Sequence, residues 1–209
     1  MTAAVSSHVA ASALLNVRAE FKGARPQVYA FKPLTIVLII LIALQTKSAA
    51  PNTYKILIVA GLLFSLAGDA FLMLPRDRFL QGLVSFFVAH VCYAVAFASD
   101  GGLAWSVWAG AGLAAYGALM LGLLWPRLGR LKMRVAAYVG VILLMAWLAL
   151  SRYLGAGPEG SGLAAAGALL FAASDSLLAW NRFKESFRAA QALVLGTYFA
   201  AQWLIALST

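Results

Sequence analysis

The sequence predicts an all-α fold, a polytopic membrane bundle of about eight transmembrane helices, and three observations support this prediction. Of the 209 residues, 63% are hydrophobic and 11% are charged, whereas soluble domains carry about 45–50% apolar and about 25% charged residues. The mean hydropathy is +0.88. The apolar residues form runs of about 20, the helix length that crosses a hydrocarbon core about 30 Å thick. Because only short gaps separate these runs, we expect one transmembrane domain over residues 1–209.

Seven apolar segments have the length of a membrane crossing. In chain order they cover about 29–46, 54–74, 79–98, 103–124, 134–154, 161–181 and 187–207. Proline or glycine breaks most of the gaps, at Pro26, Pro51, Pro75, Gly101–Gly102, Pro126 and Pro158. Lys32 and Pro33 are expected in the first turn of the segment at 29–46, where proline is tolerated.

An eighth segment, at about 3–19, is a weaker signal for insertion. It is rich in small residues and carries His8 and Asn16. Inside a bundle such a segment can still cross the membrane, and we count it as the first helix.

The composition excludes several classes of function. A soluble globule of this size does not bury so much apolar surface, and the single cysteine, Cys92, excludes a disulfide scaffold. The net charge of +9 does not indicate a nucleic-acid partner, because the basic residues form no cluster with interleaved aromatic residues. With two His and one Cys we expect no metal site, and no motif indicates another cofactor.

The Lys and Arg residues fall mainly into alternate gaps, which predicts the orientation. One side of the membrane collects thirteen of them: Arg18, Lys22, Arg25, Lys32, Arg76, Arg78, Arg127, Arg130, Lys132, Arg134, Arg182, Lys184 and Arg188. The other side has three: Lys47, Lys55 and Arg152. Because basic residues accumulate on the cytoplasmic side, the C-terminus is expected outside. We expect the chain in the cytoplasmic (inner) membrane of a bacterium.

The sequence also contains an internal repeat. GLLFSLAGDAFLMLPR (61–76) aligns without a gap on GALLFAASDSLLAWNR (167–182), so that Asp69 meets Asp175 and Arg76 meets Arg182. Chance matching of Leu, Ala and Gly in membrane helices is the alternative. Four crossings separate the copies, so both run in the same direction. The sequence therefore favours two parallel four-helix halves, about 1–100 and 101–209.

Two acids lie inside predicted helices, Asp69 and Asp175. Each precedes the cytoplasmic end of its segment by six or seven residues, a depth of about 9–10 Å at 1.5 Å per residue. A carboxylate at that depth needs a partner or a wet cavity and marks a functional site by default. If the repeat brings the two acids together, one stays protonated beside an ionised one, as general acid–base catalysis requires. The alternative is that each acid only ties helices together, through Ser65, Ser174, Ser176 or Asn181.

Other polar residues are expected to join this site. His90 lies near the midplane with Tyr93 on the same helical face, and Tyr198 and Gln202 share a face of the last segment. A lone buried His is more often a neutral hydrogen-bonded residue than a catalyst. Lys32, with Arg76 and Arg182, is placed to hold a phosphate group at the cytoplasmic side, although Lys32 can also merely extend toward the headgroups.

Five motifs together resemble the YhhN-like family of membrane proteins. They are KPLT (32–35), GLLFSLAGDAFLM (61–73), FLQGLVSFFVAHVCYAVAF (79–97), LLFAASDSLLAWNRF (169–183) and TYFAAQWLIALS (197–208). The resemblance runs from about residue 28 to the end. Characterised animal members of that family are lysoplasmalogenases, so the resemblance implies hydrolysis of the vinyl ether bond of a lysophospholipid to a fatty aldehyde and a glycerophospho-amine.

The implied reaction fits the residues. Vinyl ether hydrolysis begins with protonation of a carbon and forms an oxocarbenium ion, for which two carboxyl groups are suited. Asp69 and Asp175 are the expected acid and base in either order, His90, Tyr93, Tyr198 and Gln202 would orient water or substrate, and Lys32, Arg76 and Arg182 would face the phosphate. The bilayer and a lysophospholipid are the expected partners. A small-solute or proton-coupled transporter is the alternative function, because parallel repeats and membrane acids also occur there; a non-catalytic lipid-binding protein is a third.

Overall fold

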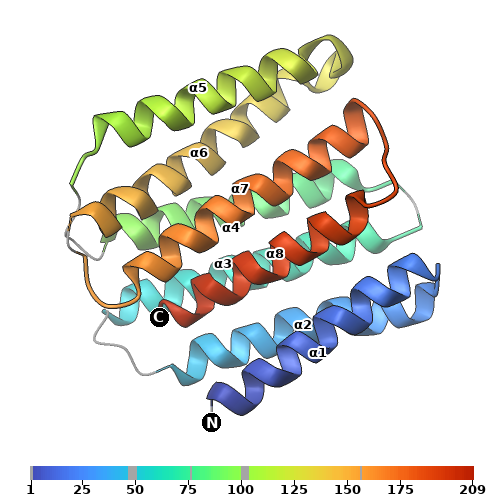
Figure 1. The fold of residues 1–209 in the computed structure, drawn as a ribbon, viewed down its shortest axis with the longest axis horizontal. Helices are drawn as coiled ribbons and strands as arrows, with labels where there is room; N and C mark the ends of the chain where they lie inside the picture. Colours follow the sequence, from blue (N-terminus) through green and yellow to red (C-terminus); the bar gives the residue numbers. More distant parts are fainter. Residues whose placement is uncertain (1, 47–50, 76, 100–103, 156) are drawn as a thin grey trace.

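The computed structural model describes residues 2–46, 51–75, 77–99, 104–155 and 157–209, and within these ranges every long element is a helix. The helices are α1 (Thr2–Phe21), α2 (Arg25–Gln45), α3 (Asn52–Met73), α4 (Phe79–Ser99), α5 (Val107–Leu124), α6 (Lys132–Leu154), α7 (Ser161–Phe183) and α8 (Ala190–Leu207), with short 3-10 helices η1 (Trp125–Arg127) and η2 (Gly129–Leu131) between α5 and α6 (Figure 1). The helices from α2 to α8 are long and apolar enough to cross a membrane. The prediction of an all-α membrane bundle is confirmed.

Helix α1 differs from the other seven. It has 20 residues, but it is not among the helices whose composition suits a membrane span. It packs against α2 and α8 in the described structure. There Ser12 Oγ lies 2.8 Å from Thr35 Oγ1, and Asn16 donates a hydrogen bond to the Val28 carbonyl. These polar contacts hold a weakly apolar helix against the bundle.

The start of α2 corrects one expectation. Pro26 does not interrupt the chain but occupies the first turn of α2, where its missing N–H costs no hydrogen bond. Pro33 therefore lies inside the helix rather than in its first turn. Lys32 is consequently placed about two turns deep in α2, where it is buried.

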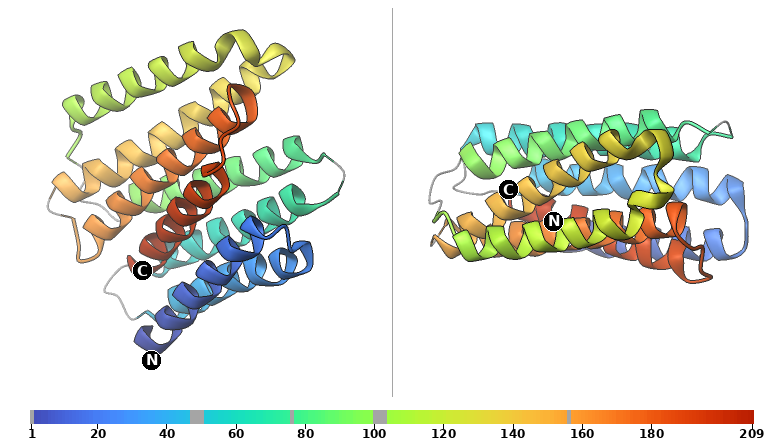
Figure 2. Two further views of the ribbon diagram at one scale, coloured as in Figure 1. Left: turned by 45° about the vertical axis from the view of Figure 1, so that its right-hand side comes forward. Right: turned by 90° about the horizontal axis from the view of Figure 1, so that it is seen from above.

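The helices alternate in direction, and their neighbours follow a regular pattern. In each half of the chain successive helices pack together: α1, α2, α3 and α4 in one, α5, α6, α7 and α8 in the other. The halves meet where α4 contacts α6 and where α1, α2 and α3 contact α8 (Figure 2). Two related halves would produce the α2–α8 and α4–α6 contacts, whereas the α1–α8 contact has no comparable counterpart between α5 and α4. The repeat, and the single domain, stay predictions.

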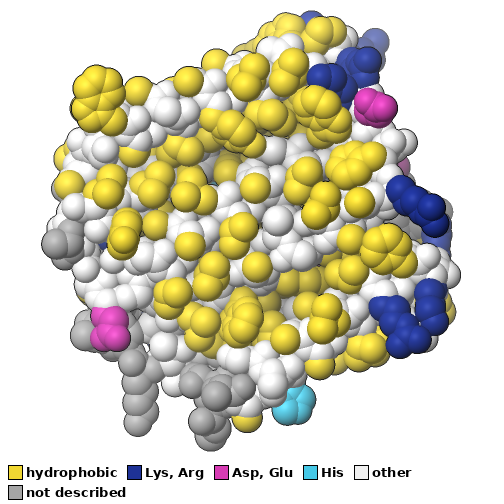
Figure 3. All heavy atoms as spheres, in the orientation of Figure 1, with side chains coloured by type: hydrophobic (Ala, Val, Ile, Leu, Met, Phe, Trp, Pro, Cys, Tyr) yellow, Lys and Arg dark blue, Asp and Glu magenta, His cyan; other side chains and the backbone are white. Residues whose placement is uncertain are grey.

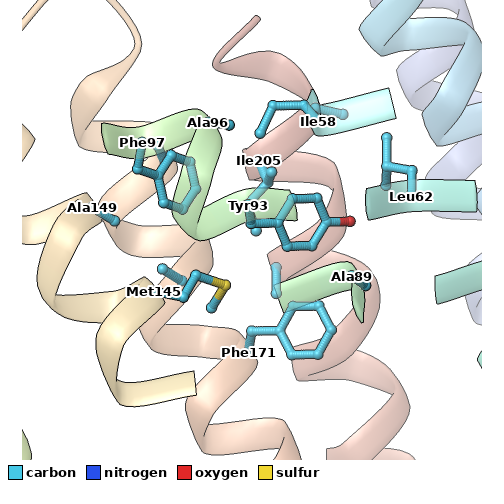
Figure 4. Close-up of a cluster of buried hydrophobic side chains, with 14 of the residues drawn as sticks. Ile58, Leu62, Ala89, Tyr93, Ala96, Phe97, Met145, Ala149, Phe171 and Ile205 are labelled. Atoms are coloured by element: carbon cyan, nitrogen blue, oxygen red, sulfur yellow. The ribbon is translucent and has the colours of Figure 1, made fainter. Parts of the chain in front are cut away.

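Two glycines allow α3 and α4 to approach closely. A side chain at Gly61 would overlap the Tyr93 ring, at 2.3 Å from its Cε1 atom, and one at Gly68 would lie 2.7 Å from Cε2 of Phe86. Because glycine has no Cβ, both rings of α4 rest directly on α3. Figure 4 shows Tyr93 in the same buried cluster as Phe97, Met145 and Phe171. This contact places α3, and with it Asp69, against the centre of the bundle.

The connections α1–α2, α3–α4, α5–α6 and α7–α8 lie at one end of the molecule (Figure 1). Lys and Arg side chains gather at this end, which we call the basic end, and hydrophobic side chains are spread over the middle of the visible face (Figure 3). An apolar belt with charged residues beyond it is the surface expected of a protein in a bilayer.

Candidate active site

Asp69 and Asp175 line one cavity of about 540 Å³ that extends toward the basic end of the bundle. The cavity lies among α2, α3, α7 and α8, with Glu20 of α1 and Phe79 and Phe86 of α4 at its boundary. Its other polar lining residues are Arg25, Tyr29, Lys32, Ser174, Arg182, Gln191 and Tyr198. The two acids of the repeat therefore face the same space.

Asp69 is held by one cation and one hydroxyl group. The Lys32 Nζ atom of α2 lies 2.9 Å from Oδ1, and the Tyr198 hydroxyl of α8 donates a hydrogen bond of 2.7 Å to Oδ2. All three side chains are buried. A buried charge is tolerated only when it is paired and hydrogen-bonded. The contacts of Asp69 meet this condition for an ionised carboxylate.

Asp175 has different partners. The Tyr138 hydroxyl of α6 donates a hydrogen bond of 2.7 Å to Oδ2, and His90 Nε2 of α4 lies 3.7 Å from the same oxygen. Among the described residues no Lys or Arg forms an ion pair with Asp175. Without a cation, burial favours the protonated form of a carboxyl group. The two acids are therefore equipped for opposite charge states.

His90 is fully buried behind Asp175. It lines neither this cavity nor a second, apolar cavity beside it. Its Nδ1 atom lies 2.6 Å from the Phe86 carbonyl oxygen, and because a carbonyl only accepts, Nδ1 carries the hydrogen. Nε2 has no hydrogen-bond partner in the described structure. The ring packs edge-on against Phe171, with centroids 4.5 Å apart. In the neutral ring, the Nε2 lone pair faces Asp175.

The three serines and the asparagine that would tie helices together make no hydrogen bond to either acid. Ser174 Oγ donates to the Val194 carbonyl, Ser176 Oγ donates to the Ala172 carbonyl, and Asn181 accepts from the Phe187 N–H. Ser65 Oγ has no hydrogen-bond partner among the contacts described. None of these side chains bonds to Asp69 or Asp175, so the structure does not favour that structural role for the two acids.

Tyr93 and Gln202 are brought together but away from the cavity. The Tyr93 hydroxyl donates a hydrogen bond of 2.7 Å to Gln202 Oε1, and both side chains are fully buried. Neither lines the cavity, whereas Tyr198 does. Direct substrate contact by Tyr93 and Gln202 therefore has no geometric support and stays a prediction.

Arg182 lies at the rim of the cavity, at the end of α7. Its Nη2 donates a hydrogen bond of 2.7 Å to Asp77 Oδ2, and the guanidinium stacks on the Phe79 ring. This hydrogen bond from Arg182, helped by one from the Phe79 N–H, lowers the pKa of Asp77 below its ordinary value. Arg76, expected beside Arg182, lies outside the described residues. No three His, Cys, Asp or Glu side chains within the described ranges lie close enough to hold a metal ion.

Sequence reasoning missed several residues of this site, among them Arg25, Tyr29 and Tyr138. The repeat carried a signal for Tyr138, because position 138 follows Lys32 by the same 106 residues that separate Asp69 from Asp175. Arg25 and Tyr29 carried no such signal. They join the site because α2 begins at Arg25, about one turn before the predicted segment.

Residues 27–209 match the YhhN family. The chain belongs to this family. It is 35% identical over 198 residues, 94% of either chain, to a protein of Escherichia coli O157:H7 named uncharacterized membrane protein YhhN. It is 39% identical over 165 residues to lysoplasmalogenase TMEM86A of Homo sapiens, covering 77% of this chain and 67% of the human protein. It is 36% identical over 162 residues to lysoplasmalogenase TMEM86B of Sus scrofa, covering 76% and 66%. No solved structure matches.

The matches also bear on where this YhhN-family chain resides and on its class of activity. Relatives named membrane proteins, together with seven apolar helices of spanning length, make it an integral multi-pass membrane protein. The resemblance noted in the sequence is confirmed at the level of the family. Relatives named lysoplasmalogenases support a membrane hydrolase.

Proposed function

We propose that this YhhN-family protein hydrolyses the vinyl ether bond of a lysoplasmalogen or of a related single-chain ether lipid. The observation that carries the proposal is the contrast between two carboxyl groups in one cavity. Asp69 is paired with the Lys32 ammonium, whereas among the described residues the polar partners of Asp175 are Tyr138 and His90. The matched human and pig proteins, both named lysoplasmalogenases, support the same reaction class.

The chemistry needs one neutral acid and one anion in the same place. A vinyl ether is activated when a proton is added to its β-carbon, and the resulting oxocarbenium ion is then attacked by water, much as in glycoside hydrolysis. Asp175, without a cation, is the proton donor. Asp69, kept ionised by Lys32, stabilises the positive charge and accepts a proton from the attacking water.

The steps balance without an external reagent. Asp175 gives its proton to the β-carbon, and Asp69 takes one proton from the water that bonds to the oxocarbenium carbon, which leaves a hemiacetal. The carbon–oxygen bond to the glycerol unit then breaks: Asp69 returns its proton to the departing oxygen, and Asp175 receives the proton of the hemiacetal hydroxyl. The products are an aldehyde and a glycerol alcohol, and both acids regain their starting states.

Three neighbours support these roles from outside the reacting atoms. Tyr138 and His90 meet the same oxygen of Asp175 from two helices and fix the orientation of the carboxyl group. Tyr198 fixes Asp69 in the same way. His90 is therefore a positioning residue in this proposal, because it is buried behind Asp175.

The rim supplies the charge that a phosphate group needs. Arg25 and Arg182 line the cavity toward the basic end. A guanidinium group binds phosphate through two parallel N–H···O hydrogen bonds. Lys32 contacts Asp69 instead, so its predicted contact with a phosphate group is replaced in this proposal by a role as counter-ion.

A substrate screen on the purified full chain tests the proposal. Choline and ethanolamine lysoplasmalogens, the matching 1-acyl lysolipids and the saturated 1-O-alkyl lysolipids are offered in detergent, and the released aldehyde is measured. We expect aldehyde from the vinyl ethers alone, and none from an Asp175→Asn variant. Release of fatty acid from the acyl lipids instead would contradict vinyl ether chemistry. Proton-coupled solute flux in proteoliposomes, with no lipid product, would favour the transporter.

A further inference from the structure

A second, apolar cavity lies beside the polar one, among α4, α5, α6 and α7. Its lining includes Leu83 of α4, Gly117 and Met120 of α5, and Val139 and Leu143 of α6. Asp175 is the one carboxyl group among its described lining residues. The cavity follows α7 from Ala172 to Phe183, a length of roughly 16 Å at 1.5 Å per residue.

The two cavities meet at a shared wall. Leu72, Phe79, Phe86, Asp175 and Leu178 line both of them. Asp69 and Lys32 line only the polar cavity. Asp175 therefore marks the junction between a space with charged walls and a space with apolar walls. A molecule with its polar part in one space and its apolar part in the other would have the bond between these parts beside Asp175.

We propose that the apolar cavity binds the hydrocarbon chain of a single-chain ether lipid whose headgroup occupies the polar cavity. This inference rests on the proposed function. The bond to be cleaved joins the chain to the glycerol unit, so seating the two parts on opposite sides of the junction brings that bond to Asp175. The arrangement also explains why the proton comes from Asp175, because Asp69 lies only on the headgroup side.

Helix α5 forms the outer wall of the apolar cavity, the proposed site of the hydrocarbon chain. Of its residues only Gly117 and Leu124 are buried, and it packs against α6 and α7 at the edge of the bundle (Figure 1). Leu119, on its outer side, is 60% exposed. Helix α5 thus separates the apolar cavity from the lipid around the protein. The cavity measures about 60 Å³, so a chain that enters it has to displace side chains of its wall.

Gly117 and Gly122 give a matched pair of variants on this helix. Gly117 lines the cavity, and a Cβ atom there would lie 2.2 Å from Leu143 Cδ1. Gly122 is exposed, with nothing within 4 Å of an added Cβ atom. Gly117→Leu fills the cavity, whereas Gly122→Leu makes the same chemical change on the outer side of α5. Both variants change helix propensity equally.

Photo-crosslinking of the detergent-purified protein tests the proposal. The probe is a 1-O-alkyl glycerophosphocholine with a diazirine near the chain end; it lacks the vinyl double bond and is not consumed. We expect cross-links on Met120, Val139 or Leu143 that excess unlabelled 1-O-alkyl lysolipid prevents. Gly117→Leu should reduce them, and raise the KM for the vinyl ether substrate, about fivefold or more, because overpacking disfavours occupancy. Gly122→Leu should change neither.

Each result separates the chain site from the proposed reaction. If the protein hydrolyses the vinyl ether but competable cross-links lie outside the apolar cavity, the proposed hydrocarbon-chain site is wrong and the proposed reaction stands. If cross-links lie in the cavity but no vinyl ether is hydrolysed, the reaction is wrong and the cavity is still a lipid-chain site. An absence of competable cross-links overturns the chain site.

Discussion

Lys32 and Tyr138 each contact one of the two acids: the Lys32 ammonium lies 2.9 Å from Asp69, and the Tyr138 hydroxyl donates a hydrogen bond of 2.7 Å to Asp175. The two donors are 106 residues apart in the chain, and so are the two acids. If the predicted repeat relates the two halves, equivalent positions carry a cation in one half and a neutral hydroxyl in the other. In the proposed mechanism this difference, together with Tyr198 beside Asp69 and His90 beside Asp175, gives the two carboxyl groups opposite charge states.

Replacing either acid by Asn should abolish turnover in a folded protein. Asn keeps the shape of the side chain but does not ionise or donate an acidic proton, and general acid catalysis contributes about 10²–10⁴-fold. We expect kcat to fall at least about a hundredfold in Asp69→Asn and in Asp175→Asn. The double variant should be little worse than either one, since the acids act as a unit.

The measurement is the rate of aldehyde release per mole of folded protein, judged by its elution profile and melting temperature. Glu159→Gln, at an exposed position in the α6–α7 connection, is the control. Near-normal kcat in a single variant would remove that acid from the catalytic assignment.

Removing Lys32 should destabilise the protein far more than removing the Tyr138 hydroxyl. Lys32→Met leaves the buried Asp69 carboxylate unpaired, which costs about 3–5 kcal/mol. Tyr138→Phe removes one hydrogen bond, which costs about 1 kcal/mol. Thermal unfolding in detergent measures both, with the exposed Lys22→Met as control.

The double variant Lys32→Met/Asp69→Asn sharpens this prediction. With the charge on residue 69 removed, it should be more stable than Lys32→Met alone. If the second change brings no recovery, Asp69 is not an ionised partner of Lys32, and the assignment of charge states is wrong.

The Asp77–Arg182 pair should compete with the substrate phosphate. Asp77 is 68% and Arg182 41% exposed, so the pair is weak and easily replaced. We expect Asp77→Asn to lower KM a few-fold by releasing the Arg182 guanidinium, and Arg182→Gln to raise it. High salt should reduce both effects, because exposed charges are screened.

The same pair has a defined pH range. Because Arg182 lowers the pKa of Asp77 below 3.8, the carboxylate is ionised, and the pair present, at any pH above that value. Acidification below this lowered pKa would protonate Asp77 and remove the pair. The ratio of KM between Asp77→Asn and the unmodified chain should therefore be constant from pH 5 to pH 8. A ratio that varies across this range would show that another group controls Arg182.

Gly68→Ala should disturb the site through packing. Its Cβ atom would lie 2.7 Å from the Phe86 ring, which also meets Tyr198 edge-on and lines both cavities. Overpacking of this kind costs about 1–3 kcal/mol. We expect a lower melting temperature and a higher KM. Gly112→Ala, with open space around the added atom, should show neither.

Much of this architecture is predictable from the sequence, since hydrophobic run length fixes the spanning helices and an acid inside such a run marks a site. Asp69 and Asp175 were found in this way, and the match at one register indicated that they belong together. The partners were harder to find. Lys32 reads as an interfacial lysine until α2 is seen to begin at Arg25, which buries Lys32 about two turns deep.

The positions of His90 and Gln202 illustrate what periodicity leaves open. Both face the interior, as the pattern of their helices predicts, but an inward face does not distinguish a cavity wall from a packed layer. Gln202 hydrogen-bonds to Tyr93 in the packed layer, and His90 reaches Asp175 from behind. Only the packing of α4 against α3 and α6 separates these environments.

The orientation of the bundle decides from which leaflet a lipid enters, and cysteine labelling tests it. Cys92 is the single cysteine, so a Cys92→Ala background accepts one new thiol at a time. Arg130→Cys, at an exposed position of the basic end, should react with a membrane-impermeant maleimide only after the cells are opened. Glu159→Cys, exposed at the other end, should react in intact cells.

Ala4→Cys should behave like Glu159→Cys, because α1 packs along α2 and its N-terminus lies at the end where the chain finishes (Figure 1). The reverse pattern would place the polar cavity, with Arg25 and Arg182, at the outer surface, and substrate would then enter from the outer leaflet.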